Sequence, residues 1–93
     1  MDKAKKTELE MKIKYIEQYE TLRIMYKYAC RYIHEQDMED KEQQLNKIEA
    51  YFSKQKRKID NKCRKKLEMT LLGVILEVRP DLLEDSHAKV TGE

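Results

Sequence analysis

Residues 15–33 read YIEQYETLRIMYKYACRYI, and this stretch decides the fold. Its apolar positions follow an unbroken 4-3-4-3-4 spacing, which places one stripe along an α-helix. Upstream, Thr7 and Glu10 form a capping-box pattern, so the sequence predicts a first helix over about residues 7–36. The stripe consists of Tyr15, Tyr19, Leu22, Tyr26, Ala29 and Ile33.

The composition of the whole chain favours long helices over sheets. Its 93 residues include only two glycines and one proline, so turns must be few. Charged residues make up 41% of the chain and hydrophobic residues 40%, but the hydrophobic ones fall into helical stripes rather than being scattered, which argues against disorder. We therefore expect a single all-α domain.

A second helix is predicted over about residues 40–79. Asp40 and Gln43 form another capping-box pattern, and the short turn before them makes the two helices an antiparallel hairpin. Pro80 ends this helix and can open a short C-terminal helix over about residues 80–85, followed by a flexible tail at 86–93. The apolar face of the second helix comprises Leu45, Ile48, Phe52, Ile59, Cys63, Leu67, Leu71, Val74 and Val78.

The segment after Thr70 is apolar in every direction around a helix and requires burial on all sides. A two-helix hairpin cannot cover it, so either a second chain does so or the residues after Pro80 fold back over it. We expect a homodimer in which two hairpins form an antiparallel four-helix bundle. Its predicted subunit interface consists of Leu71, Leu72, Val74, Ile75, Leu76 and Val78.

Charge is unevenly distributed although the chain carries only +2 overall. Residues 54–66 hold eight Lys or Arg and one acid, Asp60, between two mildly acidic segments. This basic block indicates a phosphate-binding face, a docking site for an acidic protein, or a solvated face paired with acidic residues. Its outward-facing cations are Lys54, Arg57, Lys58, Lys62, Arg64 and Lys65.

Two tyrosines lie off the helical stripe. Tyr28 and Tyr32 are four residues apart and form a predicted exposed pair, with Ile24 on the same side. Tyrosine is favoured at interfaces, so the pair indicates a contact site for a partner, although a dimer seam would use the same residues.

Neither a metal site nor a catalytic site is predicted. Cys30 and His34 have the spacing of two helical zinc ligands, but Cys63 would face them only by coincidence of register and His87 falls in the predicted tail. No nucleophile with a base, paired carboxylates or Gly-rich phosphate loop is present. We expect no cofactor and no enzymatic activity.

The expected compartment is cytoplasmic. Two cysteines are too few for a disulfide-stapled secreted scaffold, and the charged N-terminus lacks the apolar region of a signal peptide. The longest apolar stretch, residues 71–76, is far below the ~20 residues that span a bilayer, so no membrane insertion is expected.

The leading functional hypothesis is a non-enzymatic protein-interaction module, such as a small regulator, inhibitor or chaperone-like adaptor, that docks a helix face onto a partner. Tyr28 and Tyr32 would anchor the contact, and the cations of the basic block would steer it. One alternative is a sequence-independent DNA- or RNA-binding protein that uses residues 54–66. Another is a structural subunit of a larger helical assembly.

Overall fold

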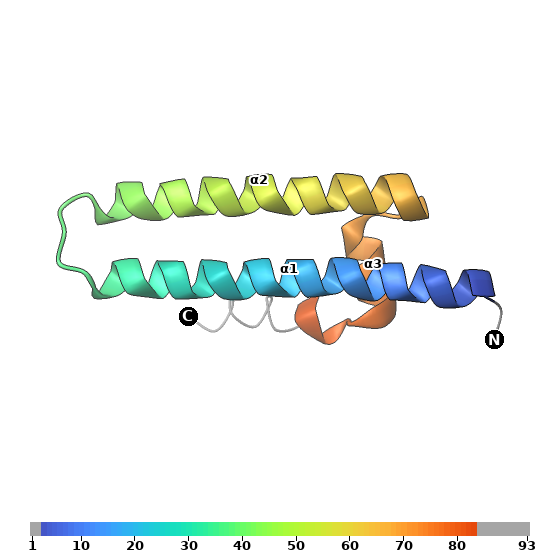
Figure 1. The fold of residues 1–93 in the computed structure, drawn as a ribbon. Helices are drawn as coiled ribbons and strands as arrows, with labels where there is room; N and C mark the ends of the chain where they lie inside the picture. The colour runs from blue at the N-terminus through green and yellow to red at the C-terminus, as the bar shows by residue number, and fades with distance from the viewer. Residues whose placement is uncertain (1–2, 84–93) are drawn as a thin grey trace.

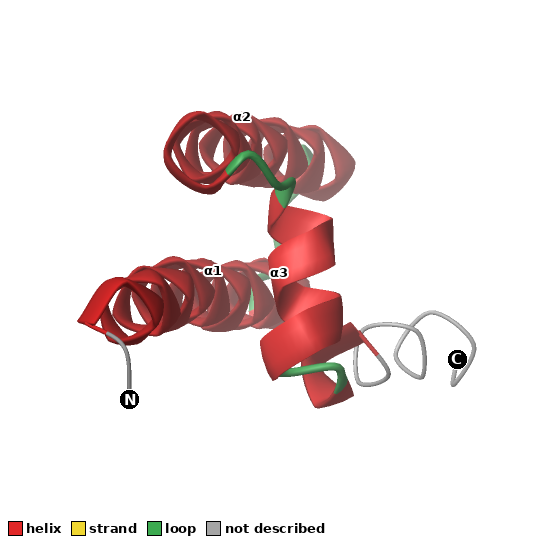
Figure 2. Cartoon of the chain, turned by 90° about the vertical axis from the view of Figure 1, so that its right-hand side faces the viewer, coloured by secondary structure: helices red, strands yellow, loops and turns green. Residues whose placement is uncertain are grey.

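The structure is a computed structural model that describes residues 3–83. Helix α1 (Lys3–Glu35) and helix α2 (Lys41–Leu67) form an antiparallel hairpin, and the short helix α3 (Leu71–Val78) follows them (Figure 1). Viewed along the hairpin, α3 crosses a single side of it, running from α2 past α1 (Figure 2). The predicted all-α hairpin with a short C-terminal helix is confirmed, since residues 3–83 contain no strand.

The tyrosine-rich stripe of α1 packs against α2, but only its first half is buried. Tyr15 and Tyr19 are 5% and 4% exposed, while Tyr26 is half-buried. The core therefore lies at the open end of the hairpin, away from the α1–α2 loop, where all three helices meet. Its members are Tyr15, Ile16, Tyr19, Cys63, Leu71, Val74, Ile75 and Leu82.

The prediction of one continuous second helix over residues 40–79 is wrong, because α2 ends at Leu67 and a separate helix, α3, begins at Leu71. Glu68 adopts a left-handed conformation (φ 56°), and its N–H donates to the Arg64 carbonyl at 2.8 Å. The left-handed conformation costs a non-glycine residue about 1–2 kcal/mol. Burial of Leu71, Val74 and Ile75 against the hairpin stabilises the fold by about 1.5–3 kcal/mol per side chain, so folding back is favoured over a straight helix.

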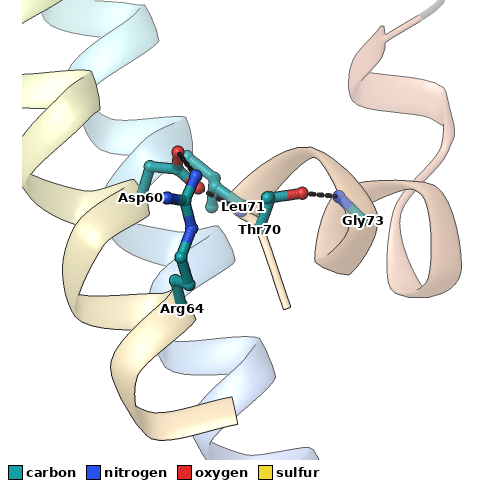
Figure 3. Close-up of polar contacts among 5 residues, drawn as sticks. All are labelled: Asp60, Arg64, Thr70, Leu71 and Gly73. Carbon is teal, nitrogen blue, oxygen red and sulfur yellow. Dashed lines mark hydrogen bonds and ion pairs between the residues drawn. The ribbon is translucent and has the colours of Figure 1, made fainter. Parts of the chain in front are cut away.

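Asp60 fixes the start of α3 from within the basic block (Figure 3). Its Oδ1 accepts the Leu71 backbone N–H at 2.6 Å, and its Oδ2 pairs with Arg64 Nη2 at 3.4 Å. The Thr70 hydroxyl caps the same helix end by accepting the Gly73 N–H at 3.2 Å. The lone acid of the block is therefore a structural residue that holds a helix N-terminus.

The predicted subunit interface is partly used inside the chain. Leu71, Val74 and Ile75 are at most 2% exposed because they pack on α1 and α2. The residues after Pro80 also fold back, as the second sequence alternative proposed, and bury Leu82 to 2% exposure. Val78 is half-buried. Only Leu72 and Leu76 of the predicted interface remain exposed, at 55% and 57%.

Charged groups also tie α3 to α1. The Lys12 side chain is buried, and its Nζ lies 2.7 Å from a Glu77 oxygen and 3.3 Å from a Glu8 oxygen. The Glu77 hydrogen bond raises the pKa of Lys12 above its usual value. A lysine on the core side of α1 was not anticipated from the sequence, and it is tolerated because its charge is paired.

The turn after α3 is closed by Arg79. Its Nε and Nη2 donate to the two carboxylate oxygens of Asp81 at 3.0 and 2.9 Å, and Glu20 of α1 lies 3.8 Å away. The guanidinium lowers the pKa of Asp81. Residues 81–83 are helical, and the rest of the predicted 80–85 helix and the predicted tail at 86–93 lie outside the described residues.

Neither capping box forms as the sequence predicted. Helix α1 already runs from Lys3, and the Thr7 hydroxyl donates to the Lys3 carbonyl at 3.0 Å instead of capping. Asp40 does precede α2, but its carboxylate accepts from the Gln44 side chain at 2.9 Å and caps no backbone N–H. Both side chains instead form hydrogen bonds with groups one helical turn away, which replace the predicted capping bonds.

Replacing Asp60 with Ala is expected to lower the free energy of unfolding by about 1–3 kcal/mol, because the Leu71 N–H loses its acceptor. Asp60→Asn keeps an amide oxygen and should cost less. Asn61→Ala, at an exposed neighbouring position, is the matched control. Urea unfolding followed by circular dichroism at 222 nm measures all three. Equal midpoints for Asp60→Ala and Asn61→Ala would contradict the role of Asp60.

The orientation of α3 predicts a large loss of stability on truncating Ile75 and a small one on truncating Leu76. Ile75→Ala is expected to cost about 2–5 kcal/mol of stability because it opens a cavity in the core. At protein concentrations low enough to keep the chain monomeric, Leu76→Ala is expected to change stability by less than about 0.5 kcal/mol, since its side chain is exposed within the chain. Thermal unfolding compares the two, and similar losses would mean that α3 is rotated from the orientation described.

Candidate functional site

The side of the hairpin opposite α3 carries several large apolar side chains. Met25, Tyr28 and Tyr32 follow one strip of α1 at i, i+3 and i+7, and Tyr51 projects from α2. They are 56%, 64%, 61% and 58% exposed, respectively. The predicted exposure of the Tyr28 and Tyr32 pair is thus confirmed, and Ile24 beside them is 42% exposed.

Two shallow clefts run between α1 and α2 on this side, and no α3 residue lines either of them. The cleft nearer the loop has a volume of about 240 Å³ and is almost entirely apolar. The other, of about 460 Å³, extends toward the open end past Lys14, Lys58 and Lys62. The loop-side cleft is lined by Leu22, Met25, Tyr26, Ala29, Gln44, Lys47, Ile48, Tyr51 and Phe52.

All the predicted contact cations of the basic block are exposed. Arg64 pairs with Asp60, whereas the others have no carboxylate within ion-pair distance among residues 3–83. They do not share one surface. Lys58 and Lys62 line the larger of the two clefts opposite α3, while Arg57 lines a cavity of about 390 Å³ beside α3. The exposed cations of the basic block therefore lie on two sides of α2.

The tyrosine pair and the basic residues lie at different heights along the hairpin. The rings of Tyr26 and Phe52 meet at 4.5 Å between centroids, which fixes the register of the two helices. At about 1.5 Å per residue, Tyr28 and Lys58 are roughly 12 Å apart along the axis. We name this long surface, apolar near the loop and basic toward the open end, the open face. It consists of Met25, Tyr28, Tyr32, Tyr51, Lys58 and Lys62.

The two cysteines are free and far apart. Counted from the Tyr26 and Phe52 contact, Cys30 and Cys63 are separated by roughly 22 Å along the hairpin, which no disulfide could bridge. Cys63 is completely buried, and this burial raises the pKa of its thiol. Within the described part of the chain, no three His, Cys, Asp or Glu side chains converge to hold a metal ion. His87 lies outside that part.

The open face includes residues that the sequence did not single out. These residues are Met25 and Tyr51. A helical-wheel count would have placed Tyr51 on the same strip as Lys58, seven residues later.

None of the three described helices is long and apolar enough to cross a membrane.

No protein-family model, curated protein or solved structure matches this chain. The function must therefore be inferred from the geometry and chemistry of its own residues.

Proposed function

We propose that this chain is a non-enzymatic protein-interaction module that docks its open face onto a partner protein and so inhibits, escorts or recruits it. One observation carries the proposal. Four large apolar side chains, each more than half exposed, lie on the strips of α1 and α2 that point away from α3. Tyr and Met are enriched in the cores of protein interfaces, and water does not favour such a cluster on a free surface.

The two halves of the open face have different roles in this proposal. Tyr28 and Tyr32 anchor the contact, because a rigid aromatic side chain buries a large area at little entropic cost. Lys58 and Lys62 lie at the basic half and steer an acidic partner, since their exposed ammonium groups have no ion pair within residues 3–83. The preferred partner is therefore a protein with an apolar patch bordered by carboxylates.

Removing the anchor rings tests the proposal. In extracts of the cells that make the protein, cross-linked capture followed by mass spectrometry identifies the partner, which is then titrated against purified variants. Tyr28→Ser with Tyr32→Ser should weaken binding at least tenfold without changing helicity, because the anchors are lost. Tyr28→Phe with Tyr32→Phe retains the rings and should retain most of the affinity. Unchanged binding by the Ser variant would refute the docking role.

The alternative of sequence-independent nucleic-acid binding is tested on the same molecule. A protein docking module should show no salt-dependent binding to a generic 30-mer duplex or single strand at low ionic strength. If such binding occurs and is abolished by Lys58→Glu with Lys62→Glu, the basic block binds phosphates and the nucleic-acid function replaces the proposed one.

We also propose that two chains pair through α3, so that their hairpins together contribute four long helices. Leu72 and Leu76 lie one turn apart and are the parts of the predicted interface that the chain itself leaves exposed. Sedimentation equilibrium should give twice the chain mass of 11.3 kDa. Leu72→Ser with Leu76→Ser should give a helical monomer, whereas the Tyr28 and Tyr32 variants should stay dimeric. A wild-type monomer would exclude this pairing.

A further inference from the structure

A second groove lies on the α3 side of the hairpin, opposite the open face. It runs between α1 and α2 from Leu83 toward the loop and has a volume of about 820 Å³. Tyr19, Tyr26 and Phe52 line it together with charged side chains of both helices. No residue of the open face lines it, although Tyr26 and Phe52 line both this groove and the loop-side cleft.

Each aromatic ring of this groove has a neighbour against one of its faces. Tyr26 and Phe52 pack against each other at 4.5 Å with a 35° tilt, and Lys56 Nζ lies 5.8 Å from the centre of the Tyr19 ring. Nucleic-acid bases stack on free ring faces. These contacts leave less ring face for a base, and the remaining apolar surface of the three rings suits aliphatic side chains.

The walls of the groove are strongly basic. Arg23 and Lys27 lie one turn apart on α1, and Lys56 projects from α2 across from them. Within residues 3–83, neither Lys27 nor Lys56 has a carboxylate at ion-pair distance. Among the described residues, Glu35 is the acidic residue that lines the groove, and it pairs with Arg31 at 3.6 Å. An occupant must therefore bring aliphatic groups for the floor and negative charges for both walls.

We propose that this groove binds an acidic amphipathic helix of a partner protein. Such a helix places aliphatic side chains every three to four residues along one strip and carboxylates on either side of it. The aliphatic strip would contact Tyr26 and Phe52, and the flanking carboxylates would pair with Lys27 and Lys56. This site is separate from the open face, and with both surfaces occupied the chain would join two partners as an adaptor.

Direct titration of the full chain tests the groove. The probe is a fluorescein-labelled helical peptide with Leu along one strip and Glu on both flanks, and the control peptide has every Glu replaced by Lys. Fluorescence anisotropy should show saturable binding of the Glu peptide only. Lys27→Glu with Lys56→Glu should weaken it at least tenfold, while Lys47→Glu with Lys54→Glu, a matched charge change on exposed positions outside the groove, should weaken it less than threefold.

Cys30 gives an independent readout because it lines the groove and is half-buried, whereas Cys63 is inaccessible. Saturating Glu peptide should slow maleimide labelling of Cys30 at least fivefold. Tyr28→Ser with Tyr32→Ser should leave both readouts unchanged, so failure of the open face does not mimic failure of the groove.

Three results would overturn the proposal. The first is equal binding of the Glu and Lys peptides, and the second is Cys30 labelling that the Glu peptide does not slow. The third concerns the acidic residues Glu84 and Asp85, which follow Leu83 in the sequence. If the peptide binds only after Glu84→Lys with Asp85→Lys, the chain's own C-terminal residues are the occupant and no partner helix is required.

Discussion

The hydrogen bond from the Leu71 N–H to the Asp60 carboxylate, at 2.6 Å, is the contact on which the open end of the molecule depends. It gives the first amide of α3 an acceptor and aims the helix across the hairpin. Leu71, Val74 and Ile75 can then be buried between α1 and α2. Without a fixed start, a short helix of eight residues would have little to hold it in place, because isolated helices of this length are unstable in water.

Helix α3 packs on only one side of the thin α1–α2 hairpin, and the other side stays exposed. The described chain measures 56 × 24 × 15 Å, so every residue of α1 and α2 that does not face its neighbour helix is close to water. At the open end, α3 and Leu82 supply the missing cover on one side. On the other side no described residue supplies such cover, and nearer the loop Met25 and Tyr51 stay exposed on that side. At the open end, this cover by α3 is what distinguishes the two sides of the hairpin.

Basic charge is present on both faces but in different settings. On the open face, Lys58 and Lys62 border a shallow cleft, whereas Lys27 and Lys56 line a groove that also holds Tyr19, Tyr26 and Phe52. Charges near low-dielectric walls act more strongly on an incoming anion than charges surrounded by water. Both proposals therefore assign an acidic partner to the surface concerned.

The local pattern of the sequence determined the two long helices and their antiparallel pairing. It also determined that Tyr28, Tyr32 and the basic block are exposed. These features follow from helical periodicity and a short turn, which depend on residues close together in the chain. The sequence also showed that the residues after Thr70 require burial on every side. Only the tertiary structure decided that this segment breaks away at Glu68, that Asp60 caps it, and that Leu72 and Leu76 alone among six predicted interface residues remain exposed. Those outcomes depend on contacts between residues distant in the chain, where the burial of α3 outweighs the local preference for a continuous helix.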